Sequence, residues 1–184
     1  MIRMTQTIQL LGPGGAGKST AGATLAARLA LPFLDLDREF ERRHGAIDEF
    51  IGTHGYQAYA RANVQAYLNI LPQLAADPGA VLALSSGFMV YPLAVHPCYS
   101  SLSTSIAARS GTFVLLPSLD RETCVAETVR RQLSRPTGRR GAARKEAVIR
   151  ERFERYISLR SPKLQTMRRV NEVVDNILMA LAAD

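Results

Sequence analysis

The 184-residue sequence has no tryptophan, three histidines and only two cysteines, Cys98 and Cys124. The cysteines have no CxxC spacing and the histidines no metal-ligand spacing, so neither residue type predicts a disulfide framework or a metal site. Isolated cysteines are typical of free thiols in a reducing compartment. No apolar run reaches the roughly 18 residues that a membrane span needs, and the first residues lack the long apolar stretch of a secretory signal. The sequence therefore predicts a cytoplasmic protein with no membrane partner.

Positive charge is concentrated late in the chain. Residues 130–169 contain 14 Arg and Lys against three acids, a local balance of +11 within a net charge of +7, which leaves −4 for the remainder. Such a segment favours a polyanion, either a nucleic acid or the phosphates of a nucleotide, although a solvated helix face has the same composition. Only Phe153 and Tyr156 interrupt it as aromatics, and no nucleic-acid module is recognisable, so nucleic acid is the weaker interpretation.

Short apolar runs alternate with helical patterns along the whole chain. This alternation predicts an α/β protein, with a parallel sheet and helices on both faces. No linker, repeat or low-complexity tract interrupts it, so we expect a single domain over residues 1–184. The expected strands cover residues 7–11, 33–34, 80–84 and 112–116, with a fifth near 167–170. The expected helices cover 18–30, two or three pieces within 38–76, and then 120–133, 142–158 and 171–183.

Residues 12–19 read Gly-Pro-Gly-Gly-Ala-Gly-Lys-Ser and match G-x-x-x-x-G-K-[ST] at every fixed position, between an expected strand and an expected helix. Small residues let the backbone curl so that successive N–H groups point at phosphate oxygens, and the helix adds its positive N-terminal end. Lys18 then reaches the β- and γ-phosphates, and the Ser19 hydroxyl ligates Mg²⁺. A glycine turn that merely joins a strand to a helix needs neither group, so the pattern predicts a site for ATP and Mg²⁺. The residues expected to hold the nucleotide are Gly12, Gly14, Gly15, Ala16, Gly17, Lys18, Ser19 and Thr20.

The motif identifies a nucleotide site but not the reaction. GTPases would need a guanine-reading N-K-x-D, which the sequence lacks. The short strand–helix pattern and the late arginine-rich segment favour a small kinase.

Beyond this motif, the chain resembles shikimate kinases and related small-metabolite kinases over nearly its full length. Phe33-Leu34-Asp35-Leu36-Asp37, followed by Phe40-Glu41, is similar to the family's F-x-D-x-D…I-E segment. The resemblance implies that Asp35 lies near the Mg²⁺ shell and that Asp37 binds the acceptor hydroxyls and acts as a base. From the residues alone, Asp37 could equally be the N-cap of the next helix. The implied fold is a three-layer P-loop kinase with a five-stranded parallel sheet of order 2-3-1-4-5, a lid at about 134–145 and acceptor-binding helices at about 38–65.

Several arginines match the family pattern. Arg135-Pro136 resembles the Arg-Pro at the start of the lid, where the arginine reaches the transferring phosphate, and Arg160-Ser161-Pro162 resembles a later Arg-x-Pro whose arginine contacts the acceptor carboxylate. Arg131 lies where an adenine-stacking or phosphate-contacting arginine is expected. Guanidinium suits all three roles because it is planar, always charged and able to bind oxyanions bidentately.

Two departures concern the acceptor. The family's Gly-Gly-Gly after the third strand is Ser85-Ser86-Gly87 here. The side chains of the two serines narrow the space in which the acceptor would approach the backbone at Ser86 and Gly87. The family's G-E-x-x-F-R runs here from Gly55 to Arg61, so that its arginine falls one residue late, about 100° around a helix. The long side chain of Arg61 could still reach the acceptor, or Ala60 could mark a true loss.

These observations predict a monomeric or weakly dimeric kinase that transfers the γ-phosphoryl group of ATP to a hydroxyl of shikimate or a similar small hydroxy acid, with Lys18, Asp37 and Arg135 as catalytic residues. The alternative is the shikimate-kinase-like ligand-sensing domain of a transcription regulator, which binds an aromatic or acyl-CoA ligand without phosphoryl transfer. No helix-turn-helix precedes the first expected strand, which counts against a complete regulator.

Overall fold

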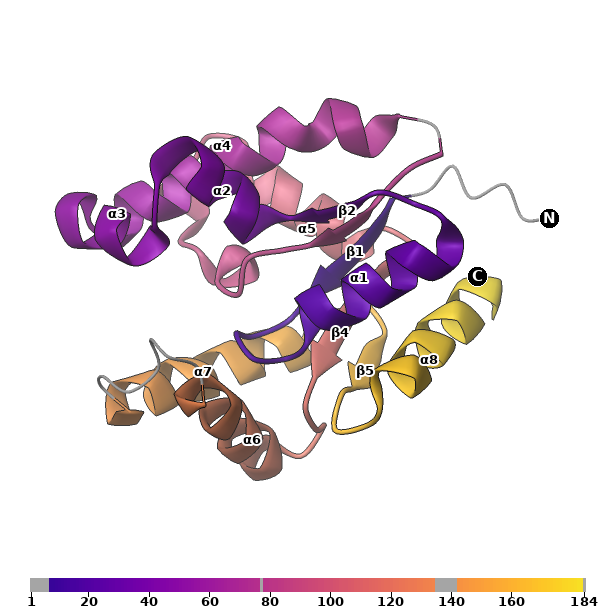
Figure 1. The fold of residues 1–184 in the computed structure, drawn as a ribbon. Helices are drawn as coiled ribbons and strands as arrows, with labels where there is room; N and C mark the ends of the chain where they lie inside the picture. Colours follow the sequence, from indigo (N-terminus) through magenta and orange to yellow (C-terminus); the bar gives the residue numbers. More distant parts are fainter. Residues whose placement is uncertain (1–6, 77, 135–141, 184) are drawn as a thin grey trace.

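The computed structural model describes residues 7–76, 78–134 and 142–183. Within them, five strands form one all-parallel sheet of order β2-β3-β1-β4-β5, with helices on both sides (Figure 1). This confirms the α/β class and the strand order expected from the sequence. The strands are β1 (Ile8–Leu11), β2 (Phe33–Asp35), β3 (Val81–Ala83), β4 (Thr112–Leu116) and β5 (Lys163–Gln165). The helices are α1 (Lys18–Leu29), α2 (Leu36–His44), α3 (Ile47–His54), α4 (Tyr56–Ala75), α5 (Tyr99–Ala108), α6 (Arg121–Leu133), α7 (Ala142–Ile157) and α8 (Val170–Ala183), with 3₁₀ turns η1 (Phe88–Val90) and η2 (Leu93–Val95).

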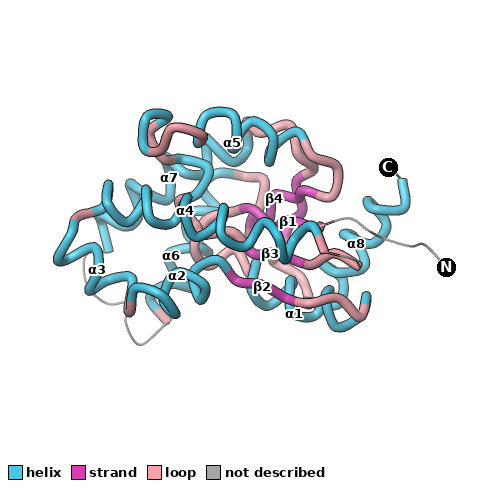
Figure 2. The backbone as a smooth tube through the Cα atoms, turned by 90° about the horizontal axis from the view of Figure 1, so that it is seen from above, coloured by secondary structure: helices cyan, strands magenta, loops and turns pink. Residues whose placement is uncertain are grey.

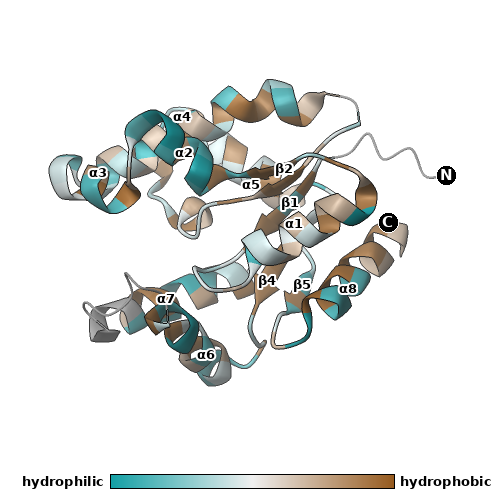
Figure 3. Cartoon of the chain, in the orientation of Figure 1, coloured by the Kyte–Doolittle hydropathy of each residue, from teal (hydrophilic) through white to brown (hydrophobic). Residues whose placement is uncertain are grey.

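The sheet separates two apolar cores. Because side chains alternate along a strand, Leu10 and Leu115 pack towards α1 and α8, whereas Leu11 and Leu116 pack towards the larger core that includes α4 and α5. Both faces are therefore covered, and the central strands β1 and β4 are buried along their whole length and mostly apolar (Figure 3). No helix within the described ranges combines the length and the apolar composition of a membrane span.

The carboxyl ends of the strands open towards two pairs of helices. In Figure 1, α2 and α3 lie on one side of this edge and α6 and α7 on the other, while Figures 1 and 2 show the start of β1 and the end of α8 towards the opposite edge. The expected helical pieces between 38 and 76 are α2, α3 and α4, which are separated at Gly45 and Gly55 as expected, both with positive φ. Of the expected lid at about 134–145, residues 135–141 lie outside the described residues, and residues 142–145 form the start of α7.

Two predictions of local structure differ from the structure. The fifth strand, expected near 167–170, is Lys163–Gln165, which pairs with Val114–Leu116 of β4. The prediction was wrong because Met167 is an exposed side chain in the turn before α8, 51% exposed, rather than a buried strand residue. Helix α5 was not expected, since it is rich in serine and threonine, which are poor helix formers. It forms because its Tyr99 and Ile106 are buried, and Thr104 Oγ1 donates to the Ser100 carbonyl of the preceding turn.

The loop after β1 needs its glycines. Gly12, Gly15 and Gly17 all have positive φ, at 141°, 90° and 87°. A Cβ at Gly12 would also lie 2.2 Å from the Leu115 carbonyl oxygen of β4. Gly12 is thus required both by its backbone conformation and by the close approach of the neighbouring strand.

We therefore expect Gly12→Ala to lower the free energy of unfolding by roughly 2–4 kcal/mol, because strain and a backbone clash combine. Gly45→Ala is the matched control, since Gly45 has a φ of 79° but no atom within 4 Å of its would-be Cβ. It should cost less, about 1–3 kcal/mol, because it carries the backbone strain of a conformation that only glycine adopts readily but no clash. Urea unfolding measures both, and equal losses would show that the β4 carbonyl does not restrict Gly12.

Candidate active site

The loop of residues 12–17 ends at the start of α1, where it presents backbone amides. Gly17 is the N-cap of α1, and no side chain within the described part of the chain caps this helix end. The first amides of a helix lack partners within it, so this end can bind an anion. The Lys18 ammonium is buried under the loop and donates to the carbonyls of Gly12 at 2.7 Å and Pro13 at 3.1 Å. These groups together form a cationic cradle suited to phosphate.

Ser19 and Asp35 meet although they are 16 residues apart. The Ser19 hydroxyl donates to Asp35 Oδ2 at 2.6 Å, because α1 and β2 both begin or end at the carboxyl edge of the sheet. A hydroxyl and a carboxylate oxygen beside a phosphate cradle suit Mg²⁺, which takes few protein ligands and completes its shell with phosphates and water. The described residues contain no group of three or more His, Cys, Asp or Glu that could hold a metal by itself. The pair therefore fits a nucleotide-bound Mg²⁺ rather than a protein-caged ion.

Asp37 is not the N-cap of α2. Asp35 is, because its Oδ1 accepts from the Asp37 backbone N–H at 3.1 Å. The Asp37 carboxylate is left facing the cleft, and its buried Oδ1 has no hydrogen-bond partner among the described residues. Asp37 is thus available to a ligand. The cleft is lined by Gly14, Gly15, Gly17, Lys18, Ser19, Thr20, Asp35, Asp37, Leu84 and Ser86.

Ser86 belongs to the same cleft and is held by α7. The Arg152 guanidinium donates to Ser86 Oγ at 3.0 Å and to the Tyr56 hydroxyl at 3.4 Å, and the Tyr156 hydroxyl donates to the Ser86 carbonyl at 3.0 Å. A Cβ at Gly87 would lie 2.6 Å from the Tyr56 hydroxyl, so Gly87 has no room for a side chain. The segment Ser86–Gly87 is therefore clamped between α4 and α7.

Sequence reasoning missed Arg152, the arginine of α7 that reaches the cleft. The sequence feature that could have identified Arg152 is its spacing from Tyr156, because residues four positions apart project from the same face of a helix. Tyr156 is fully buried, and Arg152 lies at the border of this buried face. An arginine at the edge of an apolar face in the basic segment was thus a candidate.

Two buried tyrosines lie near Asp37. Tyr59 and Tyr91 are buried, and the Tyr91 hydroxyl donates to Asn63 Oδ1 at 3.1 Å while Asn63 Nδ2 donates to Ser85 Oγ at 3.0 Å. Burial raises the pKa of both phenols well above 10, and the negative charge of Asp37 raises each further. Both phenols therefore stay neutral, and α4 is bonded to the segment after β3.

The structure does not bring Arg61 and Arg160 to the cleft. Arg61 Nε donates to the Val95 carbonyl at 3.1 Å, and Ala60, the position before it, is fully buried. The shift by one helical position turns Arg61 towards η2. Arg160 follows α7 and is exposed beside a separate hollow formed with Met89, Ser103 and Arg155.

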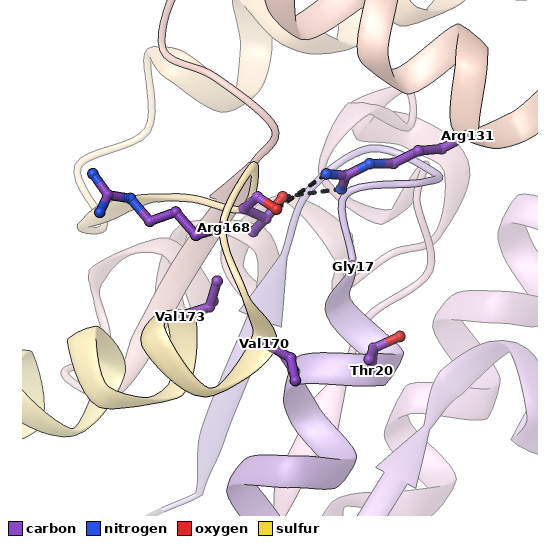
Figure 4. Close-up of a pocket in the computed structure, with 8 residues that line it drawn as sticks. Gly17, Thr20, Arg131, Arg168, Val170 and Val173 are labelled. Carbon is purple, nitrogen blue, oxygen red and sulfur yellow. Dashed lines mark hydrogen bonds between the residues drawn. The ribbon is translucent and has the colours of Figure 1, made fainter.

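Arg131 lies at a second hollow, next to the phosphate cradle. Its guanidinium donates to the Gly15 carbonyl at 3.1 Å and to the Thr166 carbonyl at 3.0 Å, which links α6 to the loop before α8. In Figure 4, Arg131 and Arg168 border this hollow from opposite sides, and Gly17, Thr20, Val170 and Val173 lie along it. Its apolar floor and arginine rim suit a flat aromatic group such as adenine. Thr166, Arg168 and Val170 were not expected from the sequence, because the fifth strand was placed too late.

Glu127 holds Arg131 in place. It accepts from Arg131 Nε at 2.6 Å and also binds the exposed Arg130, and hydrogen bonds from Arg130 and then Arg131 lower the pKa of the Glu127 carboxyl to about 2. The carboxylate is thus ionised at any ordinary pH and keeps the Arg131 guanidinium directed at the loop. Arg135, which was expected to contact the transferring phosphate, lies outside the described residues.

Proteins with similar sequences are shikimate kinases. A family model for shikimate kinase matches residues 14–182. A shikimate kinase from Thioalkalivibrio sulfidiphilus is 44% identical over 95 residues, which cover 48% of this chain and 46% of that protein. One from Alteromonas mediterranea is 34% identical over 129 residues, which cover 68% of this chain and 66% of that protein. The chain thus spans about half to two thirds of the length of these curated relatives.

Solved structures agree in fold. The shikimate kinase of Aquifex aeolicus vf5 superposes with a TM-score of 0.71 at 21% identity, covering 97% of both chains. That of Acinetobacter baumannii, in complex with shikimate, superposes with a TM-score of 0.69 at 24% identity, covering 97% of this chain and 93% of that one. Because the family model extends over nearly the whole sequence and the sheet has the expected strand order, the chain belongs to the shikimate kinase family.

Proposed function

We propose that the protein transfers the γ-phosphoryl group of ATP to a hydroxyl of shikimate or of a similar small hydroxylated acid. The observation that carries this proposal is the convergence, in one cleft, of the phosphate cradle at Lys18, the Ser19–Asp35 pair and the carboxylate of Asp37, whose buried Oδ1 has no hydrogen-bond partner among the described residues. A cradle alone would fit any nucleotide-binding protein. A carboxylate oxygen available beside it is what an acceptor hydroxyl requires.

The nucleotide would lie across both hollows. Its phosphates would bind the amides of residues 14–20 and the Lys18 ammonium, and its base would lie in the hollow between Arg131 and Val170. Ser19 and Asp35 would hold Mg²⁺, which neutralises charge on the β- and γ-phosphates when it is bound. Arg135 and the lid at about 134–145 stay assigned to the γ-phosphate by the resemblance to the family.

Asp37 would orient the acceptor hydroxyl and take its proton. The oxygen of that hydroxyl forms a bond to the γ-phosphorus while the bond to the β–γ bridging oxygen breaks, so the products are a phosphate ester and ADP. Lys18 stabilises the charge on the transferring group, and Asp37 carries the proton released by the acceptor. These roles of Lys18 and Asp37 require only that both side chains face the space between the phosphate cradle and the Asp37 carboxylate.

Arg152 is our candidate for the carboxylate of the acceptor. It is the guanidinium that the structure places with Ser86 and Tyr56 beside the cleft, whereas Arg61 and Arg160 point elsewhere. Bidentate binding by a guanidinium would orient a carboxylate about this point. Arg61 and Arg160 remain the candidates that the family pattern suggested.

The decisive test is a coupled assay of ADP release with ATP and Mg²⁺ over shikimate, other hydroxylated acids and acyl-CoAs. Acceptor-dependent ADP release that disappears in Lys18→Ala supports the kinase. Tight acyl-CoA binding with no turnover of any acid would instead support a ligand-sensing domain. A thermal-shift panel with the same compounds reports binding without turnover, because a ligand of the native state raises its melting temperature.

We expect Asp37→Asn to lower kcat by about 10²–10⁴-fold, the usual contribution of a general base, and to leave the Kd for ATP within about twofold. Asparagine keeps the shape but cannot take a proton. Steady-state kinetics and nucleotide titration measure the two effects separately. Equal losses in turnover and ATP binding would contradict a role at the acceptor.

We expect Arg152→Met to raise KM for the acid acceptor by roughly 10–100-fold, because a charged hydrogen bond contributes about 1.5–3 kcal/mol. KM for ATP should change little. Arg61→Met and Arg160→Met are the matched controls and should each stay within about twofold of the wild type, since neither side chain faces the cleft. A larger loss in Arg61→Met than in Arg152→Met would return the carboxylate site to the family's position on α4.

A further inference from the structure

The first four carbonyls of the phosphate loop, those of residues 12–15, are each held by a side chain. Lys18 donates to Gly12 O and Pro13 O, as described above. The next two carbonyls turn to the last helical turn of α6, where Gln132 Nε2 donates to Gly14 O at 2.7 Å and Arg131 Nη1 donates to Gly15 O at 3.1 Å. The loop is therefore braced from two sides, by its own lysine and by α6.

A hydrogen bond that fixes the direction of a backbone carbonyl also fixes the direction of the N–H of the next residue. A peptide unit is planar and trans, so its C=O and its N–H point in opposite directions. When Gln132 draws Gly14 O towards α6, the N–H of Gly15 is directed to the opposite side of the same peptide. Gly14 and Gly15 both line the cleft with Lys18, and α6 lies outside that lining.

Glycines do not hold such an orientation by themselves. They rotate freely about φ and ψ, so a glycine pair needs an external contact to keep one peptide orientation. The helix is close enough to supply it, because a Cβ at Gly14 would lie 3.1 Å from Gln132 Nε2 and one at Gly15 would lie 3.6 Å from Gln132 Cγ. Gln132 is also the more specific of the two contacts. Arg131 binds Glu127 and Thr166 as well, whereas the Gln132 side chain bonds only to Gly14 within the described ranges.

We propose that Gln132 is a positioning residue for phosphate binding, which holds the Gly14–Gly15 peptide so that the Gly15 N–H faces the phosphates of the nucleotide. The role rests on the proposed function for its ligand, and it acts through the loop and not by contact with the nucleotide. It also places a brace for the phosphate loop in the last turn of α6. That turn leads directly into residues 135–141, so the segment expected to be the lid begins at the residues that hold the loop.

The experiment compares Gln132→Met, which removes the donor without adding charge, with Gln132→Glu, which puts a carboxylate against the Gly14 carbonyl. Gln65→Glu is the matched control, since Gln65 is exposed on α4 and bonds to Asn69. Calorimetric titration with ATP-Mg²⁺, ADP-Mg²⁺ and adenosine measures affinity. We expect ATP and ADP to bind about 3–10-fold more weakly to Gln132→Met, the usual effect of one neutral hydrogen bond, and more weakly still to Gln132→Glu.

Adenosine affinity should not change in any variant, because the loop contacts phosphate. ATP binding to Gln132→Met as tight as to the wild type would overturn the inference, as would an equal loss for adenosine. Amide hydrogen exchange in the nucleotide-free protein provides a second readout that does not depend on the proposed function. The amides of residues 14–17 should exchange several-fold faster in Gln132→Met and at the wild-type rate in Gln65→Glu, and unchanged exchange in Gln132→Met would overturn the inference. A wild-type protein that does not bind ATP would sink the proposed function, and the exchange result would still decide the role of Gln132.

Discussion

Parallel strands all end at the same edge of a sheet, and this geometric constraint brings together the phosphate loop, the two aspartates and Ser86. The loop after β1 carries the amides and Lys18, the end of β2 carries Asp35 and Asp37, and the segment after β3 carries Ser86. The three strands are neighbours in the order β2-β3-β1, so their ends converge without any long connection. A strand order with β2 and β1 at opposite edges would separate Ser19 from Asp35, and the metal pair would not exist.

The backbone of the loop supplies more of the site than the side chains do. Amide dipoles bind phosphate only when they point the same way, and a glycine-rich loop loses that alignment unless its carbonyls are held. Here Lys18, Gln132 and Arg131 hold them, while Gly12 is kept small by the β4 carbonyl. The tight packing of the loop against β4 and α6 therefore contributes to phosphate binding, because it keeps the amide dipoles aligned.

The proposed acceptor side is built differently. Near Asp37, buried tyrosine, asparagine and serine side chains bond to one another, and the charged groups proposed to bind the acceptor are the carboxylate of Asp37 and the guanidinium of Arg152. The serines of Ser85-Ser86-Gly87 take part in this network, since Ser85 accepts from Asn63 and Ser86 accepts from Arg152. The departures from the family pattern therefore fall on the proposed acceptor side and leave the phosphate-loop motif intact.

The sequence pattern predicted the structure correctly wherever that structure depends on residues close together in the chain. The motif at 12–19, the strand–helix alternation and the breaks at Gly45 and Gly55 could all be read because turn chemistry and apolar periodicity act over a few residues. The same reasoning failed for β5, since Lys163–Gln165 is a strand only through its pairing with β4, and for α5, whose serines are outweighed by packing.

What the sequence determined by itself was the α/β class and the phosphate loop, since these follow from residue types at fixed short spacings, whereas the roles of Asp35 and Asp37 were implied by the resemblance to a family. Which arginine lies against Ser86, on the proposed acceptor side, was decided only by the tertiary structure. Arg61, Arg152 and Arg160 are the same residue type, so the sequence alone does not distinguish them. The direction in which each side chain leaves the backbone, and the packing of α7 beside the segment after β3, place only Arg152 of these three against Ser86. The brace from Gln132 to Gly14 joins residues 118 positions apart, and only the packing of α6 against the loop could bring them together.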